Sequence, residues 1–94
     1  MTNRVTTAEQ VRTEIKNLIA VVTERDAEEV SDTALFVDDL GVDSLMAMEV
    51  MVTVDKKFKI DIPEEEFSQI KNVDEAVATV MRHLSKGEVG QAAV

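Results

Sequence analysis

The sequence of 94 residues contains no cysteine. Disulfide bonds and thiolate metal sites are therefore excluded, and the absence fits a reducing compartment. No apolar run approaches the roughly 20 residues that span a bilayer, and residues 1–10 lack the apolar core of a signal peptide. We therefore expect a soluble, cytoplasmic protein. A chain of this length has room for a single core, which predicts one domain.

Basic residues are scarce relative to acidic ones. Ten Lys and Arg residues stand against nineteen Asp and Glu residues, which gives a net charge of −9. A surface this negative repels nucleic acid, whose binding requires Lys and Arg to neutralise phosphates. The acids gather in residues 24–43 and 61–75, and each of these stretches contains a single base. This clustering predicts attraction to basic surfaces of partner proteins.

Apolar residues at alternating spacings of three and four predict a helix over residues 8–23. Thr6 with Glu9, or Thr7 with Gln10, offers a capping box at its start. The periodicity fails over residues 24–43, which predicts a long ordered loop. Four apolar residues are expected to hold this loop to the bundle, namely Leu35, Phe36, Val37 and Leu40.

A second helix is predicted over residues 44–58, and its apolar residues cover most of the circumference, which indicates a central position. Pro63 is suited to begin a short third helix, because the acids that follow it complement the positive end of the helix dipole. Asn72, with Glu75 three residues later, predicts the start of a fourth helix.

The apolar stripe of the fourth helix ends at Leu84. His83, near this end, is interpreted as a cation or as a partner of the helix dipole. Residues 85–94 contain two glycines and little pattern and are expected to form a flexible tail, while residues 1–6 are expected to be disordered. The predicted fold is all-α, a bundle of three main helices and a short third one, formed by residues 7–84.

The most informative stretch is the junction between the loop and the second helix. Gly41 permits a tight backbone path, and Asp43 or Ser44 can act as the N-cap. The Ser44 hydroxyl then lies at the positive end of a helix dipole, where a phosphate ester is electrostatically favoured. Taken alone, such an aspartate or serine before an amphipathic helix is most often only a cap.

The whole string around this junction resembles the phosphopantetheine attachment motif of acyl carrier proteins. The similarity covers about residues 8–84 and follows the order of the predicted helices. The residues that carry it are Asp39-Leu40-Gly41, Asp43-Ser44-Leu45, Glu49, Phe58, Ile62-Pro63 and Val73.

The resemblance implies that Ser44 accepts 4′-phosphopantetheine from coenzyme A, through a phosphopantetheinyl transferase that recognises Asp43. The chain would then hold acyl intermediates as thioesters in type II fatty-acid, polyketide or specialised lipid biosynthesis. It would be a carrier and not an enzyme, a monomer without a metal ion or membrane insertion. Its further partners would be ketosynthases, acyltransferases and other biosynthetic enzymes with basic docking patches.

Two sets of residues follow from the same resemblance. Contacts with partner enzymes are expected from Asp39, Val42, Leu45, Met46, Glu49, Val52, Lys56 and Lys57. An acyl pocket between the second and third helices is expected to be lined by Phe36, Met51, Val54, Ile62, Phe67 and Ile70. Met46, Phe67 and the two lysines depart from the pattern common in fatty-acid carriers. We hypothesise that Lys56 and Lys57 discourage docking of a fatty-acid ketosynthase.

The same residues exclude two other functions and leave three open. A serine hydrolase is excluded, because Val42 interrupts a GDSL-like string and the only histidine, His83, lies on the last helix. An EF-hand is excluded, because oxygen ligands required by its loop, counted from Asp38 or Asp39, fall on Leu40, Gly41 or Val42, whose side chains have no oxygen. An amino-acyl carrier of the D-alanyl kind, a peptidyl carrier and an unmodified acidic helical adaptor stay open. Peptidyl carriers usually have a histidine where this chain has Asp43.

Overall fold

The computed structural model describes the backbone of residues 7–93 and the side chains of residues 7–85. The described part is all-helical and contains no strand, which confirms the predicted all-α fold with its short third helix. The elements are α1 (Ala8–Thr23), the 3-10 turn η1 (Ala27–Glu29), α2 (Ser44–Phe58), α3 (Glu64–Phe67) and α4 (Val73–Ala93). The expected disorder of residues 1–6 concerns residues outside the described part.

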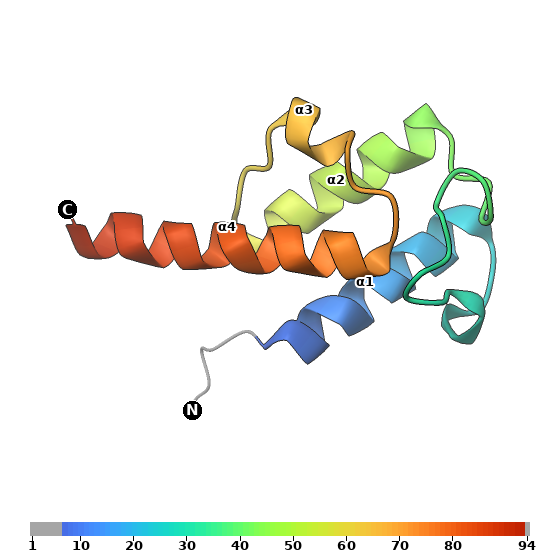
Figure 1. Cartoon of the computed structure of the whole chain (residues 1–94), viewed down its shortest axis with the longest axis horizontal. Helices are drawn as coiled ribbons and strands as arrows, with labels where there is room; N and C mark the ends of the chain where they lie inside the picture. Colours follow the sequence, from blue (N-terminus) through green and yellow to red (C-terminus); the bar gives the residue numbers. More distant parts are fainter. Residues whose placement is uncertain (1–6, 94) are drawn as a thin grey trace.

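Helix α1 is the centre of the packing, because both α4 and α2 lie against it. In Figure 1, α4 crosses α1, and α3 lies on the side of α4 opposite to the start of α1. The loop between α1 and α2 closes one end of the bundle. The large side chains that are most completely buried come from α1, α4 and the loop, and they are Ile15, Ile19, Val11, Val30, Val73 and Val80. Full burial of such a side chain stabilises the fold by about 1.5–3 kcal/mol.

The start of α1 is fixed by a capping box. The Gln10 N–H donates to the Thr7 hydroxyl over 3.1 Å, and the Thr7 N–H donates to the Gln10 side-chain oxygen over 3.1 Å. Of the two boxes that the sequence allows, the structure therefore forms the one at Thr7. The helix ends where Glu24 adopts a left-handed conformation with φ 58°, so the predicted bounds of this helix are confirmed.

The long loop is attached to the bundle through two of its four predicted anchors. Phe36 and Leu40 are buried, whereas Leu35 is 36% exposed and Val37 is 69% exposed. The Asp39 N–H donates to the Leu35 carbonyl oxygen over 2.9 Å, so this stretch forms a helical turn. In such a turn only residues three or four apart share a face, and for this reason Phe36 and Leu40 point inward together.

A cluster of ion pairs fixes the same loop between α1 and α4. The Asp32 carboxylate lies 2.8 Å from Lys16 Nζ and 3.3 Å from Arg12 Nη1, and Arg12 also pairs with Asp74 at 2.6 Å. The Asp74 N–H donates to the Asp32 carbonyl oxygen over 3.1 Å. The side-chain hydrogen bond from Lys16 is the largest cause that holds the pKa of Asp32 below its ordinary value.

Replacing Asp32 with asparagine is therefore expected to lower the melting temperature by a few degrees at neutral pH. Because the pKa is depressed in the folded state, the stabilisation is present above the ordinary pKa of 3.8 and is lost as the pH falls through the folded-state value. The difference in melting temperature between wild type and Asp32→Asn should therefore become smaller at acidic pH. The control is Glu28→Gln, an exposed acid of the same loop. Thermal denaturation at several pH values tests this, and a gap that stays constant with pH would contradict it.

The last helix is longer than the sequence predicts. α4 runs to Ala93, so the predicted helix end at Leu84 is wrong. The expected flexibility of residues 85–94 stays a prediction, and residue 94 lies outside the described part. A glycine in a helix interior costs only about 1 kcal/mol relative to alanine, and most of the residues around Gly87 and Gly90 are good helix formers. None of the described helices, α4 included, is long and apolar enough to cross a membrane.

Candidate functional site

The segment that leads into α2 is held from two sides. Within it, the Leu35 N–H donates to the Asp39 carboxylate over 2.8 Å, and the Val42 N–H donates to the Phe36 carbonyl oxygen over 2.8 Å. Outside it, the Phe36 N–H donates to the carbonyl oxygen of Lys71, just before α4, over 2.9 Å. The chain then turns at Gly41, whose φ of 72° is one that glycine adopts without strain. The first residues of α2 are thereby fixed in position.

Asp43 is the N-cap of α2, and this decides between the two caps that the sequence allows. Its backbone is extended, and its carboxylate accepts a hydrogen bond from the Met46 N–H over 2.9 Å. Ser44 is consequently the first residue of the helix, and its exposed hydroxyl has no part in the cap. The unpaired N–H groups of the first helical turn favour an anion at this position.

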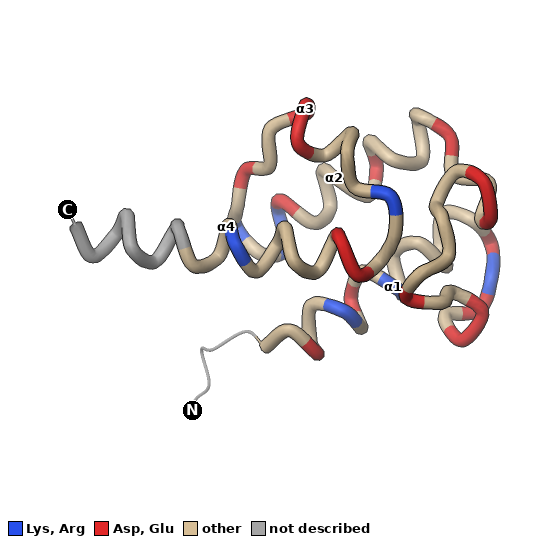
Figure 2. The backbone as a smooth tube through the Cα atoms, in the orientation of Figure 1, with Lys and Arg blue, Asp and Glu red and all other residues tan. Residues whose placement is uncertain are grey.

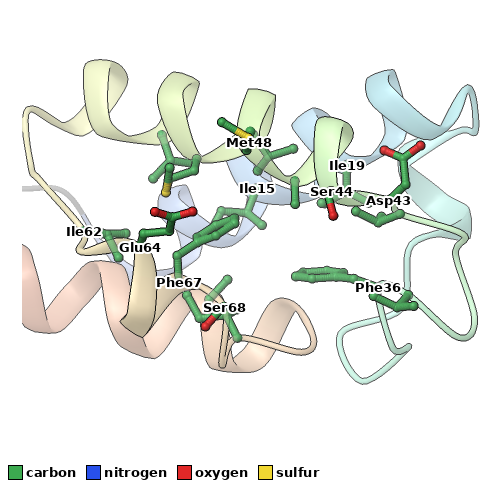
Figure 3. Close-up of a pocket in the computed structure, with 18 of the residues that line it drawn as sticks. Ile15, Ile19, Phe36, Asp43, Ser44, Met48, Ile62, Glu64, Phe67 and Ser68 are labelled. Carbon is green, nitrogen blue, oxygen red and sulfur yellow. The ribbon is translucent and has the colours of Figure 1, made fainter.

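Beside Ser44 lies a cavity of about 660 Å³. In Figure 3 it is enclosed by α2 above and α4 below, with α3 at one end and the loop at the other, and Ser44 and Asp43 stand at the loop end. Phe36 extends from the loop and Phe67 from α3 toward the interior. Apart from Asp43, Ser44, Glu64 and Ser68, the lining side chains are apolar. A cavity of this kind holds an apolar chain better than a polar or charged group.

All six residues of the predicted acyl pocket line this cavity. Sequence reasoning missed its deepest wall, to which α1 contributes Ile15 and Ile19 and α4 contributes Ala76 and Val80. It also missed Ala47 and Met48 on α2. The apolar stripes of α1 and α4 identify these residues as core, but a stripe gives no sign that packing against it is incomplete.

The predicted partner contacts divide by exposure. Six of the eight residues are exposed, namely Asp39, Leu45, Glu49, Val52, Lys56 and Lys57. Val42 is only 5% exposed and lines the cavity, so it offers partners little surface, and its predicted contact with partners stays a prediction. The turn at Gly41 directs it inward. Met46 is half-buried and packs against the core, although the sequence places it on the polar side of α2.

Lys57 has a partner within the fold. Its Nζ lies 3.3 Å from a carboxylate oxygen of Glu14 on α1. The two lysines that the sequence treats as a pair therefore differ, because Lys57 ties α2 to α1 while Lys56 takes part in no ion pair among the described residues.

His83 does not act at a helix end. It is half-buried in the middle of α4, and its Nε2 lies 2.8 Å from a carboxylate oxygen of Glu66 on α3. Arg82 pairs with the other oxygen of the same carboxylate. The predicted role as partner of the helix dipole is therefore wrong, because α4 continues ten residues past His83 to Ala93. His83 and Arg82 instead hold α3 against α4 beside the cavity.

Asp55 orders the connection between α2 and α3. Its carboxylate accepts a hydrogen bond from the Ile62 N–H over 3.3 Å, and Ile62 lines the cavity. Partial burial is the main cause that raises the pKa of Asp55 above its ordinary value.

The described residues contain no group of three or more His, Cys, Asp or Glu side chains that could hold a metal ion.

Comparison with known proteins bears directly on this arrangement. Residues 13–80 match the family described as "Phosphopantetheine attachment site". The acyl carrier protein of Brachyspira hyodysenteriae (strain ATCC 49526 / WA1) is 39% identical over 71 residues, which are 74% of this chain and 91% of that protein. This chain belongs to the acyl carrier protein family. A second member, the acyl carrier protein of Rickettsia bellii (strain RML369-C), is 43% identical over 58 residues, or 62% of this chain and 67% of that protein.

Solved structures of acyl carrier proteins have the same fold. The acyl carrier protein from Enterococcus faecalis, described for its high thermal stability, matches with a TM-score of 0.72 at 27% identity, over 83% of this chain and 99% of that chain. The apo doublet acyl carrier protein from prodigiosin biosynthesis matches with a TM-score of 0.69 at 27% identity, over 85% of this chain and 40% of that chain.

The prosthetic group of this carrier is 4′-phosphopantetheine, attached covalently. The residues around Ser44 fit such a group. The hydroxyl of Ser44 is exposed and free of the cap, the first turn of α2 favours a phosphate, and an apolar cavity opens directly beside it.

Proposed function

We propose that Ser44 is the attachment residue for 4′-phosphopantetheine and that the chain carries acyl intermediates between enzymes without being a catalyst itself. The observation that carries this proposal is the position of an exposed serine hydroxyl at the end of a large apolar cavity. The proposed carrier domain comprises residues 7–84, since the described core residues all lie within this range.

The residues of the chain have separate tasks in this mechanism. Asp43 caps α2, which leaves the Ser44 hydroxyl available to the transferase. The first turn of α2 stabilises the phosphodiester at Ser44 through its N–H groups and the helix dipole. When bound, 4′-phosphopantetheine supplies the thiol to which an acyl group is joined as a thioester. The apolar residues around the cavity take up the acyl chain and exclude water from it.

The cavity supports an acyl cargo over an amino-acyl or peptidyl one. Burial of each methylene group is favourable by about 0.8 kcal/mol, whereas an ammonium group placed among the apolar lining side chains loses its hydration. The two lining residues that carry carboxylates, Asp43 and Glu64, are exposed to solvent. Fatty-acid, polyketide and specialised lipid biosynthesis all use cargo of the first kind. The partners on this proposal are a phosphopantetheinyl transferase and ketosynthases, acyltransferases and other biosynthetic enzymes with basic docking patches, which act on the monomeric carrier in the cytoplasm.

The choice of cargo is tested by loading the carrier with an octanoyl or a D-alanyl group and recording methyl resonances. The octanoyl group is expected to shift the methyl signals of Ile15, Val54 and Ile62, because these side chains line the cavity. The D-alanyl group should leave them unchanged. The methyl signals of the exposed Val21 are the internal control. Larger shifts with D-alanyl than with octanoyl would favour the amino-acyl carrier instead.

A further inference from the structure

One face of α2 is exposed and carries large apolar side chains together with charges of both signs. Leu45 is 71% exposed, Met48 is 52% exposed and Val52 is 46% exposed. Glu49 and Lys56 are also exposed and lie seven residues apart, which is close to two helical turns. These five residues, which we call the α2 stripe, therefore form one continuous face. Large apolar side chains exposed in a row indicate a contact surface.

The charges on the α2 stripe are ordered along the helix. Glu49 lies in the half of the stripe nearer Ser44, Lys56 lies at the far end, and Val52 stands between them. In Figure 2 the end of α2 shows acidic and basic colours side by side, because Asp55 precedes Lys56. Asp55 is not part of the α2 stripe, since it is half-buried and its carboxylate accepts a hydrogen bond from the Ile62 N–H. At 1.5 Å per residue, the two charged residues of the stripe are separated by about 10 Å along the axis.

Lys56 is the lysine of α2 that is available to a partner. The residues three and four positions away, where a helical ion pair would form, are Val52, Thr53, Lys59 and Ile60, and none of them is acidic. Lys57, by contrast, already faces Glu14 on α1. A cation at the edge of an apolar contact surface is best satisfied by a carboxylate across the interface.

We propose that the enzymes cognate to this carrier place a carboxylate opposite Lys56 when they dock on the α2 stripe. Such an enzyme presents a basic group toward Glu49, an apolar hollow for Met48 and Val52, and an acidic group about 10 Å beyond the basic one. An enzyme surface that is basic throughout matches the first half of the stripe and repels the second. This inference rests on the proposed carrier function, and it assigns partner selection to Lys56 and not to Lys57.

The test uses a bacterial fatty-acid ketosynthase with a basic docking patch, in which each basic residue of the patch is changed to glutamate in turn. The carriers are wild type and Lys56→Glu, both loaded at Ser44. With the unaltered ketosynthase, Lys56→Glu should react about tenfold faster than wild type, because a repulsion becomes an attraction. The gain should shrink as salt rises. With one of the altered enzymes the order should reverse, and wild type should react faster.

Lys71→Glu is the matched control, because it changes the net charge equally at an exposed position away from α2. Its rate should stay within about twofold of wild type, as expected for a screened charge outside the contact. Loading by the transferase is measured separately for every variant, so that a failure of Ser44 to accept phosphopantetheine is distinguished from a failure of this inference. Equal rates for wild type and Lys56→Glu across the whole scan, including no reaction by either, would overturn the proposal.

Discussion

Replacing Ser44 with alanine is expected to abolish loading by a promiscuous phosphopantetheinyl transferase and coenzyme A. The variant lacks the only atom of that side chain that can form the phosphodiester. The fold should persist, because Asp43 and not Ser44 caps α2. Intact-mass measurement should show one added phosphopantetheine on wild type and none on Ser44→Ala, with equal helical circular dichroism for both.

Ser68→Ala is the matched control for this prediction, because Ser68, the C-cap of α3, also lines the cavity. It should load like wild type. Loading of Ser44→Ala would show that a different residue is the acceptor, and loss of loading in Ser68→Ala alone would move the site to Ser68.

Replacing Ala47 with phenylalanine is expected to expel an octanoyl chain from the cavity. Ala47 lies one turn beyond Ser44 and lines the cavity, so a ring at this position fills the space beside the attachment site. Loss of burial for only two methylene groups, about 1.6 kcal/mol, shifts the balance between buried and exposed chain by more than about tenfold. Cleavage of the octanoyl thioester by hydroxylamine should therefore accelerate, and the methyl signals of Ile15 and Ile62 in octanoyl Ala47→Phe should match those of the same variant without the octanoyl group.

Ala78→Phe is the matched control, because Ala78 is an exposed alanine on α4. It should leave both the cleavage rate and the methyl signals as in wild type. A cavity of about 660 Å³ has room for the ring at position 47, so the melting temperature of Ala47→Phe should stay close to that of wild type. Protection of the thioester in Ala47→Phe equal to that in wild type would show that the chain is held elsewhere.

The helices themselves were predictable because their signals are local. Regular apolar spacing places α1 over residues 8–23, although the sequence leaves Thr6 and Thr7 both possible as its cap, and the step from Asp43 into a nearly continuous apolar run defines α2. The helix start at the proposed attachment site was predictable for a related reason, since Gly41, Asp43 and Ser44 lie within four residues of the sequence. The resemblance to a known family added the identity of the attached group, which no spacing of residues could supply.

Features that depend on contacts between distant segments were not predictable. Glu14 and Lys57 meet only because α1 packs against α2, and Glu66 meets His83 only because α3 folds back onto α4. The inward orientation of Val42 has a local cause instead, namely the turn at Gly41 and the hydrogen bond from the Val42 N–H to the Phe36 carbonyl oxygen, but residue spacing alone does not reveal it. The presence of a cavity is likewise a property of how the helices are spaced, and apolar patterning is the same for a filled core and a hollow one.

The central claim is that Ser44 carries the prosthetic group, and peptide mapping of the carrier expressed together with a phosphopantetheinyl transferase tests it most directly. Tandem mass spectrometry should find one phosphopantetheine per chain, on the peptide that contains Ser44 and at that residue. An unmodified chain, or a modification at Ser31, Ser68 or Ser85, would contradict the assignment.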